Sequence, residues 1–238
     1  MVNLEEQIKK RCSIVMATYN GEKYIKQQIE SILKNMSDND ELIISDDGST
    51  DKTIQIINEY KDNRIKLIEG PRKGVKQNFA NVIGKAEGSY IFLSDQDDIW
   101  MENKIELVLN AFENNKVSVV IHDTEVIDEN LKVTIPSFFE YRKSGKGVLK
   151  NIYKNSYIGC CMAFEANLKQ YILPIPNDIE MHDQWIGILG ETKGKGSLFL
   201  KEKLIKYRRH SNNVSQMKHY GILKMIRNRI VLIKNLIK

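Results

Sequence analysis

The sequence has little of what marks secreted or membrane-spanning proteins. It holds three cysteines in 238 residues, and this odd count, with Cys160 and Cys161 adjacent, makes a poor disulfide framework. Apolar neighbours around Cys12 and the adjacent pair instead predict buried thiols in a reducing compartment. No window approaches the ~18 uncharged apolar residues of a membrane span, and the first ten residues lack the apolar stretch of a secretory signal. We therefore expect a cytoplasmic protein.

The chain also lacks a Pro/Ser-rich linker, an internal repeat and a cysteine–histidine spacing of the zinc type. A chain of this length is sufficient for one sizeable core. We expect one domain over residues 1–215, followed by a terminal helix within 216–238.

Acidic residues are missing from the segment 217–238, which holds six basic ones. These six account for the whole positive excess of a chain with a net charge of +5, so the body is not a basic nucleic-acid binder. The segment is also rich in Ile and Leu and predicts a basic amphipathic helix over about 219–237. Such a helix lies on the inner face of an anionic membrane, or packs on the body or a partner subunit. The basic residues are Lys218, Lys224, Arg227, Arg229, Lys234 and Lys238.

Strand and helix patterns alternate through the first hundred residues. Short apolar runs bounded by turn residues indicate buried strands, and apolar residues at helical spacing indicate the helices between them. This alternation predicts an α/β fold with a mostly parallel sheet flanked by helices. The expected strands cover 12–16, 41–45, 64–68 and 89–93, and the expected helices cover 22–33, 51–60 and about 75–85.

The alternation weakens further along the chain. A hairpin or loop is expected over 123–145, between a strand at 117–122 and the apolar strand at about 158–164. The other expected elements are helices at about 102–114, 166–171 and 183–190, and a last strand over 199–207.

Three carboxylates stand within four residues, directly after the strand expected at 89–93. Asp95, Asp97 and Asp98 repel one another unless a cation or water neutralises them, and Mg²⁺ and Mn²⁺ prefer oxygen ligands. A solvated acidic loop is the plain alternative. Polar residues also follow the first two strands, and ligands of parallel sheets bind at the carboxyl ends of strands. We therefore favour a cation and phosphate site at this edge.

Asp46 and Asp47 follow the second strand and have two interpretations. A carboxylate there accepts hydrogen bonds from a base or ribose, or the segment forms a turn with Ser49 or Thr50 as the cap of the next helix. Both hold if each aspartate has one role.

Five segments, in order, resemble family 2 glycosyltransferases. Single motifs of this kind are weak, but five at plausible spacing are specific, and together they cover about 11–215. The DQDD-I-W segment and the YRRHxNN ending are most similar to the bacterial rhamnosyltransferase-like branch that builds surface polysaccharides. The resemblance implies a GT-A (Rossmann-like) fold, a nucleotide-sugar donor and a divalent metal, Mg²⁺ or Mn²⁺. The segments are 13–20, 44–51, 92–100, 181–185 and 207–213.

The resemblance also implies roles at the donor site. The Thr18–Tyr19 loop and Asp47 would hold the base, and Asp95 would contact the ribose or the sugar. The full set implied for the donor is Thr18, Tyr19, Asp46, Asp47, Lys73, Gly74, Asn78 and Asp95.

The reacting groups follow from the same resemblance. Asp97 would ligate the metal directly, and His210 would be a further contact of the metal or the diphosphate. Asp98 would support the metal site without touching the metal itself. Asp183 stands where the family keeps its catalytic base, which deprotonates the acceptor hydroxyl in an inverting transfer. Plainer roles are a helix cap for Asp183 and a surface position for His210.

Two further features have open interpretations. Trp185 is a packing residue or a stacking face for an acceptor sugar. Arg208 and Arg209 are solvated charges or a clamp on the diphosphate.

The sequence therefore predicts an inverting, metal-dependent transfer of a sugar from dTDP-rhamnose or a UDP-hexose to a glycan or lipid-linked acceptor. Both bases are pyrimidines with a similar imide edge, so Asp47 does not separate them. A nucleotidyltransferase is one alternative, although the loop at 18–21 is a poor match to a glycine-rich phosphate loop. A module that binds nucleotide sugars without turnover is the other.

Overall fold

The computed structural model describes residues 11–211, 213 and 221–237. The described strands are β1 (Cys12–Thr18), β2 (Glu41–Asp46), β3 (Ile65–Glu69), β4 (Tyr90–Ser94), β5 (Ile99–Trp100), β6 (Val119–Ile127), β7 (Val133–Ile135), β8 (Met162–Glu165) and β9 (Ser197–Arg208). The described helices are α1 (Ile25–Leu33), α2 (Thr53–Asn58), α3 (Val75–Lys85), α4 (Lys104–Asn115), α5 (Phe138–Arg142), α6 (Val148–Tyr153), α7 (Lys169–Ile172), α8 (His182–Thr192) and α9 (Ile222–Ile237).

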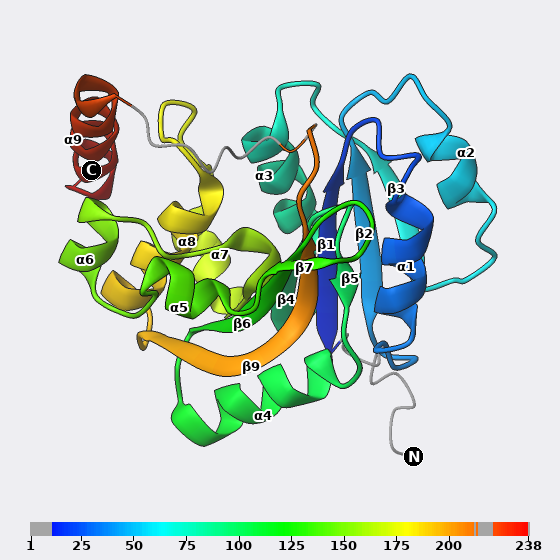
Figure 1. Cartoon of the computed structure of the whole chain (residues 1–238), viewed down its shortest axis with the longest axis horizontal. Helices are drawn as coiled ribbons and strands as arrows, with labels where there is room; N and C mark the ends of the chain where they lie inside the picture. Colours follow the sequence, from blue (N-terminus) through cyan, green and yellow to red (C-terminus); the bar gives the residue numbers. More distant parts are fainter. Residues whose placement is uncertain (1–10, 212, 214–220, 238) are drawn as a thin grey trace, which may run out of the picture.

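The strands form one sheet in the order β3-β2-β1-β4-β8-β6-β9-β5, with β7 paired to β6. The first four strands are parallel, as the alternating pattern predicts. Beyond them the sheet is mixed, because β8 runs antiparallel to β4 and β6 while β9 runs parallel to β6 and antiparallel to β5. Figure 1 shows α1 and α2 on one side of the molecule and α9 on the other, beside α6. The predicted α/β fold, with a curled sheet flanked by helices, is confirmed.

Burial explains why the first strands read as continuous apolar runs. Every residue of β2 is buried, and β1 has only one partly exposed residue. Strands covered on both faces have no solvent side and therefore need no alternation. α3 covers one of these faces with Phe79, Val82 and Ile83, and all three are fully buried.

One local prediction is wrong. Neither Ser49 nor Thr50 caps α2, which begins at Thr53 after an N-cap residue, Lys52, that makes no side-chain cap. The Ser49 hydroxyl is used elsewhere, since it donates to Asp46 Oδ2 at 2.5 Å and accepts from the backbone N–H of Asn20 at 2.8 Å. This contact joins the loops after β1 and β2.

Some predicted features fall outside the described residues. These are residues 1–10, the boundary expected at 215/216, the start of the helix expected at 219, Lys218 and Lys238. Within the described part, all three cysteines are free and buried, as predicted. No described helix combines the length and apolar character needed to cross a bilayer.

Candidate active site

The loops after β1, β2 and β4 meet at one edge of the sheet, where they line a cavity of about 660 Å³. This convergence was predicted from the polar residues that follow each strand. The structure brings most of the predicted site residues into the cavity wall, together with residues that sequence reasoning missed, among them Arg72, Gln96 and Asn213. The predicted residues in the wall are Thr18, Tyr19, Asp47, Gly74, Asn78, Asp95, Asp97 and Asp183.

Gln96 ties two of these loops together. Its Oε1 accepts from the backbone N–H of Tyr19 at 2.9 Å and from the Thr18 hydroxyl, and its Nε2 donates to the Tyr19 carbonyl at 3.1 Å. The sequence contained a signal for this residue, because Gln96 stands between two of the motif's aspartates. Its contacts hold the β1 loop against the β4 loop across the cavity wall.

Asp46 and Asp47 occupy different positions in the structure. Asp46 Oδ1 accepts from the backbone N–H groups of Gly48 and Ser49 at 3.0 and 2.8 Å, so this side chain builds the turn. It is buried and does not line the cavity, in contrast to the predicted donor contact. Asp47 does line the cavity, and its Oδ2 accepts from Gly74 N–H at 2.7 Å.

The loop before α3 presents a different cation from the one expected. Lys73 offers its backbone N–H to Asp47 Oδ1 at 3.3 Å, and its side chain is not part of the cavity wall. Arg72 lines the cavity instead, with its side chain against Gly48. Arg72 has a positive φ of 57°, which turns the chain at this point. A pattern of residue types does not reveal such a backbone turn.

Asn78 secures the ends of β1 and β2. It is 1% exposed, and its Nδ2 donates to the carbonyls of Ser45 and Thr18 at 2.7 and 3.4 Å. The residue therefore fixes the spacing of the two strand ends from beneath the cavity.

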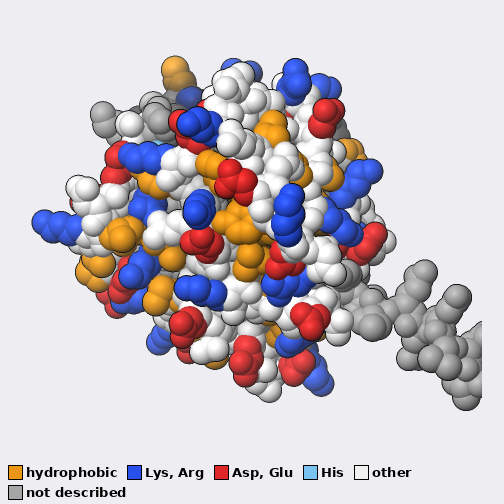
Figure 2. Space-filling view, turned by 90° about the vertical axis from the view of Figure 1, so that its right-hand side faces the viewer, with side chains coloured by type: hydrophobic (Ala, Val, Ile, Leu, Met, Phe, Trp, Pro, Cys, Tyr) orange, Lys and Arg blue, Asp and Glu red, His pale blue; other side chains and the backbone are white. Residues whose placement is uncertain are grey.

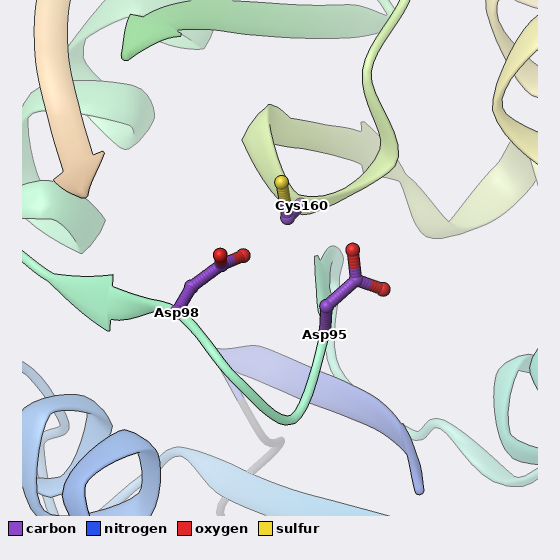
Figure 3. A group of neighbouring side chains, drawn as sticks. All are labelled: Asp95, Asp98 and Cys160. Carbon is purple, nitrogen blue, oxygen red and sulfur yellow. The ribbon is translucent and has the colours of Figure 1, made fainter. Parts of the chain in front are cut away.

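Asp95 and Asp98 form the inner part of the carboxylate cluster. Figure 3 shows both side chains on the side of the loop that faces Cys160, and the potential ligand atoms of all three residues lie within 4.8 Å of one another. Burial and the neighbouring Asp97 raise the pKa of Asp95 to about 7 and that of Asp98 well above its usual range. Asp98 is fully buried and its Oδ1 accepts from Arg208 N–H at 2.9 Å, so it lies behind the cavity wall.

Asp97 and His210 form the outer part of the cluster. His210 Nε2 lies 2.7 Å from Asp97 Oδ2, and Asn213 Nδ2 donates to the same oxygen at 3.1 Å. The imidazole is held by stacking on Tyr24, with ring centroids 4.9 Å apart. The predicted metal ligands are thus brought together, and Asp97 lines the cavity.

The two parts of the cluster differ in how well they fit a hard divalent cation. Burial raises the pKa of the Cys160 thiol, and a protonated thiol is a poor partner for Mg²⁺ or Mn²⁺. Asp97 and His210 offer a carboxylate oxygen and an imidazole nitrogen beside the cavity, both suitable for Mn²⁺. The residues present therefore fit a cation, and the outer pair fits it better.

Arg208 is an internal support for the carboxylates. It is 2% exposed, its Nε donates to the Asp97 carbonyl at 2.8 Å, and its guanidinium lies 4.7 Å from the Tyr24 ring centroid. The interpretation of Arg208 as a solvated charge is therefore wrong, and its role as a clamp on the diphosphate stays a prediction. An arginine in the sequence is compatible with either interpretation, but β9 buries Arg208 beneath the carboxylate loop at 95–98.

Lys104 is a second buried cation, and sequence reasoning missed it. At the start of α4 it resembles an exposed helix residue, yet it is 1% exposed. Its Nζ donates to the Cys160 carbonyl at 3.1 Å and lies 3.7 Å from the Trp100 ring centroid. Burial lowers its pKa to about 8, while the charges of Asp98 and Asp95 oppose that shift.

Asp183 faces the cavity from a separate element, the first turn of α8. Its Oδ1 accepts from Gln184 N–H at 2.6 Å, and burial raises its pKa to about 6. The N-cap position is Met181, so Asp183 is not the helix cap that the plainer interpretation required. A carboxylate with this pKa is mostly ionised at neutral pH and can accept a proton.

The neighbours of Asp183 are structural. His182 stacks on Phe79 with ring centroids 4.1 Å apart, and burial lowers its pKa to about 3, so it is neutral. Trp185 is 6% exposed, donates its indole N–H to the Ile172 carbonyl at 3.0 Å and is not in the cavity wall. The geometry favours packing over the stacking face considered for Trp185.

Comparison with known proteins yields curated relatives over much of the chain. The Escherichia coli UDP-Glc:α-D-GlcNAc-diphosphoundecaprenol β-1,3-glucosyltransferase WfgD is 34% identical over 152 residues, 62% of this chain and 57% of its own. The Shigella flexneri dTDP-rhamnosyl transferase RfbG is 28% identical over 239 residues, covering 90% and 80% of the two chains. The chain thus spans less than two thirds of WfgD.

Solved structures show the same fold. Residues 1–349 of S. aureus TarS in complex with UDP-GlcNAc match with a TM-score of 0.74 at 19% identity, covering 94% of this chain and 67% of that one. The Pyrobaculum calidifontis mannosyltransferase PcManGT, in complex with GDP-Man and Mn²⁺, matches with a TM-score of 0.65 at 16% identity, covering 85% and 58%. The family model described as glycosyl transferase family 2 matches residues 13–188. With that match over most of its length, the chain belongs to glycosyl transferase family 2 and has the GT-A fold.

Proposed function

We propose that this protein transfers a sugar, with inversion, from a nucleotide-sugar donor to a glycan or lipid-linked acceptor in bacterial surface polysaccharide biosynthesis. One observation supports this most. A single cavity of about 660 Å³ is lined by Asp47, Asp95 and Asp97 from the strand-end loops and by Asp183 from α8. A cavity of this volume suits a small-molecule ligand. The carboxylates for cation and donor binding thus share a cavity with a separate base.

The donor is dTDP-rhamnose or a UDP-hexose. The two relatives named above carry these donors in their names, and both nucleotides have pyrimidine bases. Thr18, Tyr19 and Asp47 lie together in the cavity wall and are the candidate base-binding residues. Arg72 lines the same region and supplies a positive charge for a phosphate.

A divalent cation belongs to the proposal. Asp97 and His210 are the residues that would hold it, with Asp95 toward the donor and Asp98 buried behind. When bound, the cation neutralises charge on the departing nucleoside diphosphate, which needs charge compensation more than a proton.

Asp183 performs the proton transfer. Its carboxylate accepts the proton of the acceptor hydroxyl while that oxygen attacks the anomeric carbon from the face opposite the diphosphate. The bond between the anomeric carbon and the phosphate oxygen breaks, and both electrons leave with the diphosphate. The raised pKa of Asp183, about 6, suits a base that works near neutral pH.

Two measurements test the proposal. Thermal unfolding with UDP, dTDP or GDP, each with and without Mn²⁺, should show a stabilisation by UDP or dTDP that increases with the metal. Release of nucleoside diphosphate from dTDP-rhamnose or UDP-glucose then reports turnover. No metal-dependent stabilisation by any nucleotide would contradict the proposed site. Binding without turnover, over a panel of donors and acceptors, would favour a binding module.

A further inference from the structure

α9 has one face packed on the body. Leu232 is 3% exposed on that face, and two asparagines beside it bond to the segment before α8. Asn228 Nδ2 donates to Glu180 Oε2 at 2.6 Å, and Asn235 Nδ2 donates to Asp178 Oδ1 at 3.1 Å. The helix is therefore fixed in orientation relative to the protein.

The opposite face of α9 is apolar and exposed. Five large side chains at alternating spacings of three and four residues form one stripe along the helix. Their exposed fractions run from 39% to 85%, in a chain where large apolar side chains are mostly buried. This α9 apolar stripe consists of Leu223, Ile226, Ile230, Ile233 and Ile237.

Positive charge borders the stripe. At 100° per residue, Arg227 and Lys234 lie at its edge and Lys224 lies just beyond them. Arg229, on the other side, is held by the body, because its Nε donates to the Tyr153 carbonyl at 3.1 Å. The described part of α9 contains no acidic residue. On the opposite face of the molecule, over α1 and α2, basic and acidic side chains are interspersed (Figure 2). α9 therefore combines an apolar stripe with charge of one sign along its described length.

We propose that α9 docks this protein on an anionic lipid surface, with the α9 apolar stripe in the interfacial region and the bordering basic residues at the headgroups. Helices with a basic polar face and a large apolar face bind in this way, and each Lys or Arg near an anionic surface strengthens binding by about fivefold. A second copy of the chain is a poorer partner, because two α9 helices would bring like charges together.

Docking through α9 would also orient the cavity. The segment that α9 holds, through Asp178 and Glu180, leads directly into Met181, His182 and Asp183 of the cavity wall. The side of the cavity that holds the proposed base therefore lies next to the docked helix. Docking does not depend on the proposed sugar transfer, so an experiment can contradict one proposal and leave the other standing.

The first test uses the full-length wild-type chain and sedimentation with vesicles. We expect binding to mixed phosphatidylglycerol–phosphatidylcholine vesicles, weaker binding at high salt, and little binding to phosphatidylcholine alone. Equal binding to both compositions, or none to the anionic one, overturns the proposal.

The second test uses variants of the stripe with a matched control. The double variant I230S/I233S should reduce binding to anionic vesicles by about a hundredfold, since each isoleucine withdrawn from the interface costs about tenfold. L107S changes an apolar residue on α4 with the same exposure as Ile233, 39%, and should bind as the wild type does. R227E/K234E should also lose binding. Unchanged binding by the stripe variant, or loss of a dimer rather than of vesicle binding, overturns the proposal. Unchanged thermal unfolding shows that the variants are folded.

Discussion

The two halves of the sheet build the cavity in different ways. In the parallel half, β1, β2 and β4 each end in a loop whose residues line the cavity, so sequence order and site geometry agree. In the mixed half, the contributing residues return from far along the chain. His210 meets Asp97 across 113 positions, and Arg208 meets Asp98 across 110.

This difference shows how the carboxylate loop is completed. β5 pairs antiparallel with β9, and Ile99 stands opposite Lys206. Because β5 directly follows the aspartates, the register of β9 places Arg208 and His210 against them. The parallel half supplies the acidic loop, and the mixed half supplies groups that form hydrogen bonds with it and orient it.

The largest effect should come from the base in the mixed half. D183N removes the proton acceptor and should reduce transfer by about 10³-fold or more, within the usual range for general bases, while Mn²⁺-dependent stabilisation by UDP or dTDP persists. Single-turnover release of nucleotide measures the first quantity, and thermal unfolding measures the second. E106Q, at an exposed carboxylate on α4, is the control. Loss of nucleotide binding in D183N would show that donor binding and proton transfer are not carried by separate parts of the site.

D97N should be the next most severe, because it removes the anionic ligand shared by both halves. We expect the Mn²⁺-dependent part of the nucleotide stabilisation to disappear and kcat/KM to fall about 10²-fold. C160S at the inner cluster should leave that stabilisation intact. The reverse pattern would place the cation at Asp95, Asp98 and Cys160.

R208M tests the support between the halves. It removes the hydrogen bonds to the Asp97 carbonyl and to Gln27 Oε1, so we expect the free energy of unfolding to fall by about 2–3 kcal/mol. R64M is the matched control, since Arg64 pairs with Asp62 in a partly exposed position outside the cavity wall and should cost less than about 1 kcal/mol. Equal losses in chemical denaturation would contradict the supporting role of Arg208.

The smallest effect is a pH dependence. The carboxylate of Asp183 must be ionised to accept a proton, and its pKa of about 6 lies above the usual value. kcat/KM should therefore be level near neutral pH and fall about tenfold per unit as the pH drops below about 6. A profile of the wild type from pH 4.5 to 8 checks this. A fall that begins near pH 4, with the protein still folded, would indicate an unperturbed group.

Much of the parallel half was predictable because its signals are local. The buried run at β2 and the polar residues after it are adjacent in sequence, so both the strand and the position of Asp47 follow from a short window. The same holds for Asp97 after β4. A turn-building aspartate was predicted for this loop, but which of Asp46 and Asp47 builds the turn depends on the backbone of Gly48 and Ser49.

The mixed half was less predictable because its contacts are long-range. β5 has only two residues and forms by pairing with β9, so no periodic pattern in the sequence predicts it. Lys104 and Arg208 have the composition of surface residues, and only the tertiary fold buries them. Asn213 was part of a recognised segment, yet its bond to Asp97 depends on where β9 ends.

The most direct test of this account is a crystal structure of the protein with UDP or dTDP and Mn²⁺, using the anomalous signal of manganese to locate the cation. The account predicts manganese at about 2 Å from Asp97 and from His210, in contact with the diphosphate, with Asp183 facing the position of the transferred sugar. Manganese bound by Asp95, Asp98 and Cys160, away from Asp97 and His210, would contradict it.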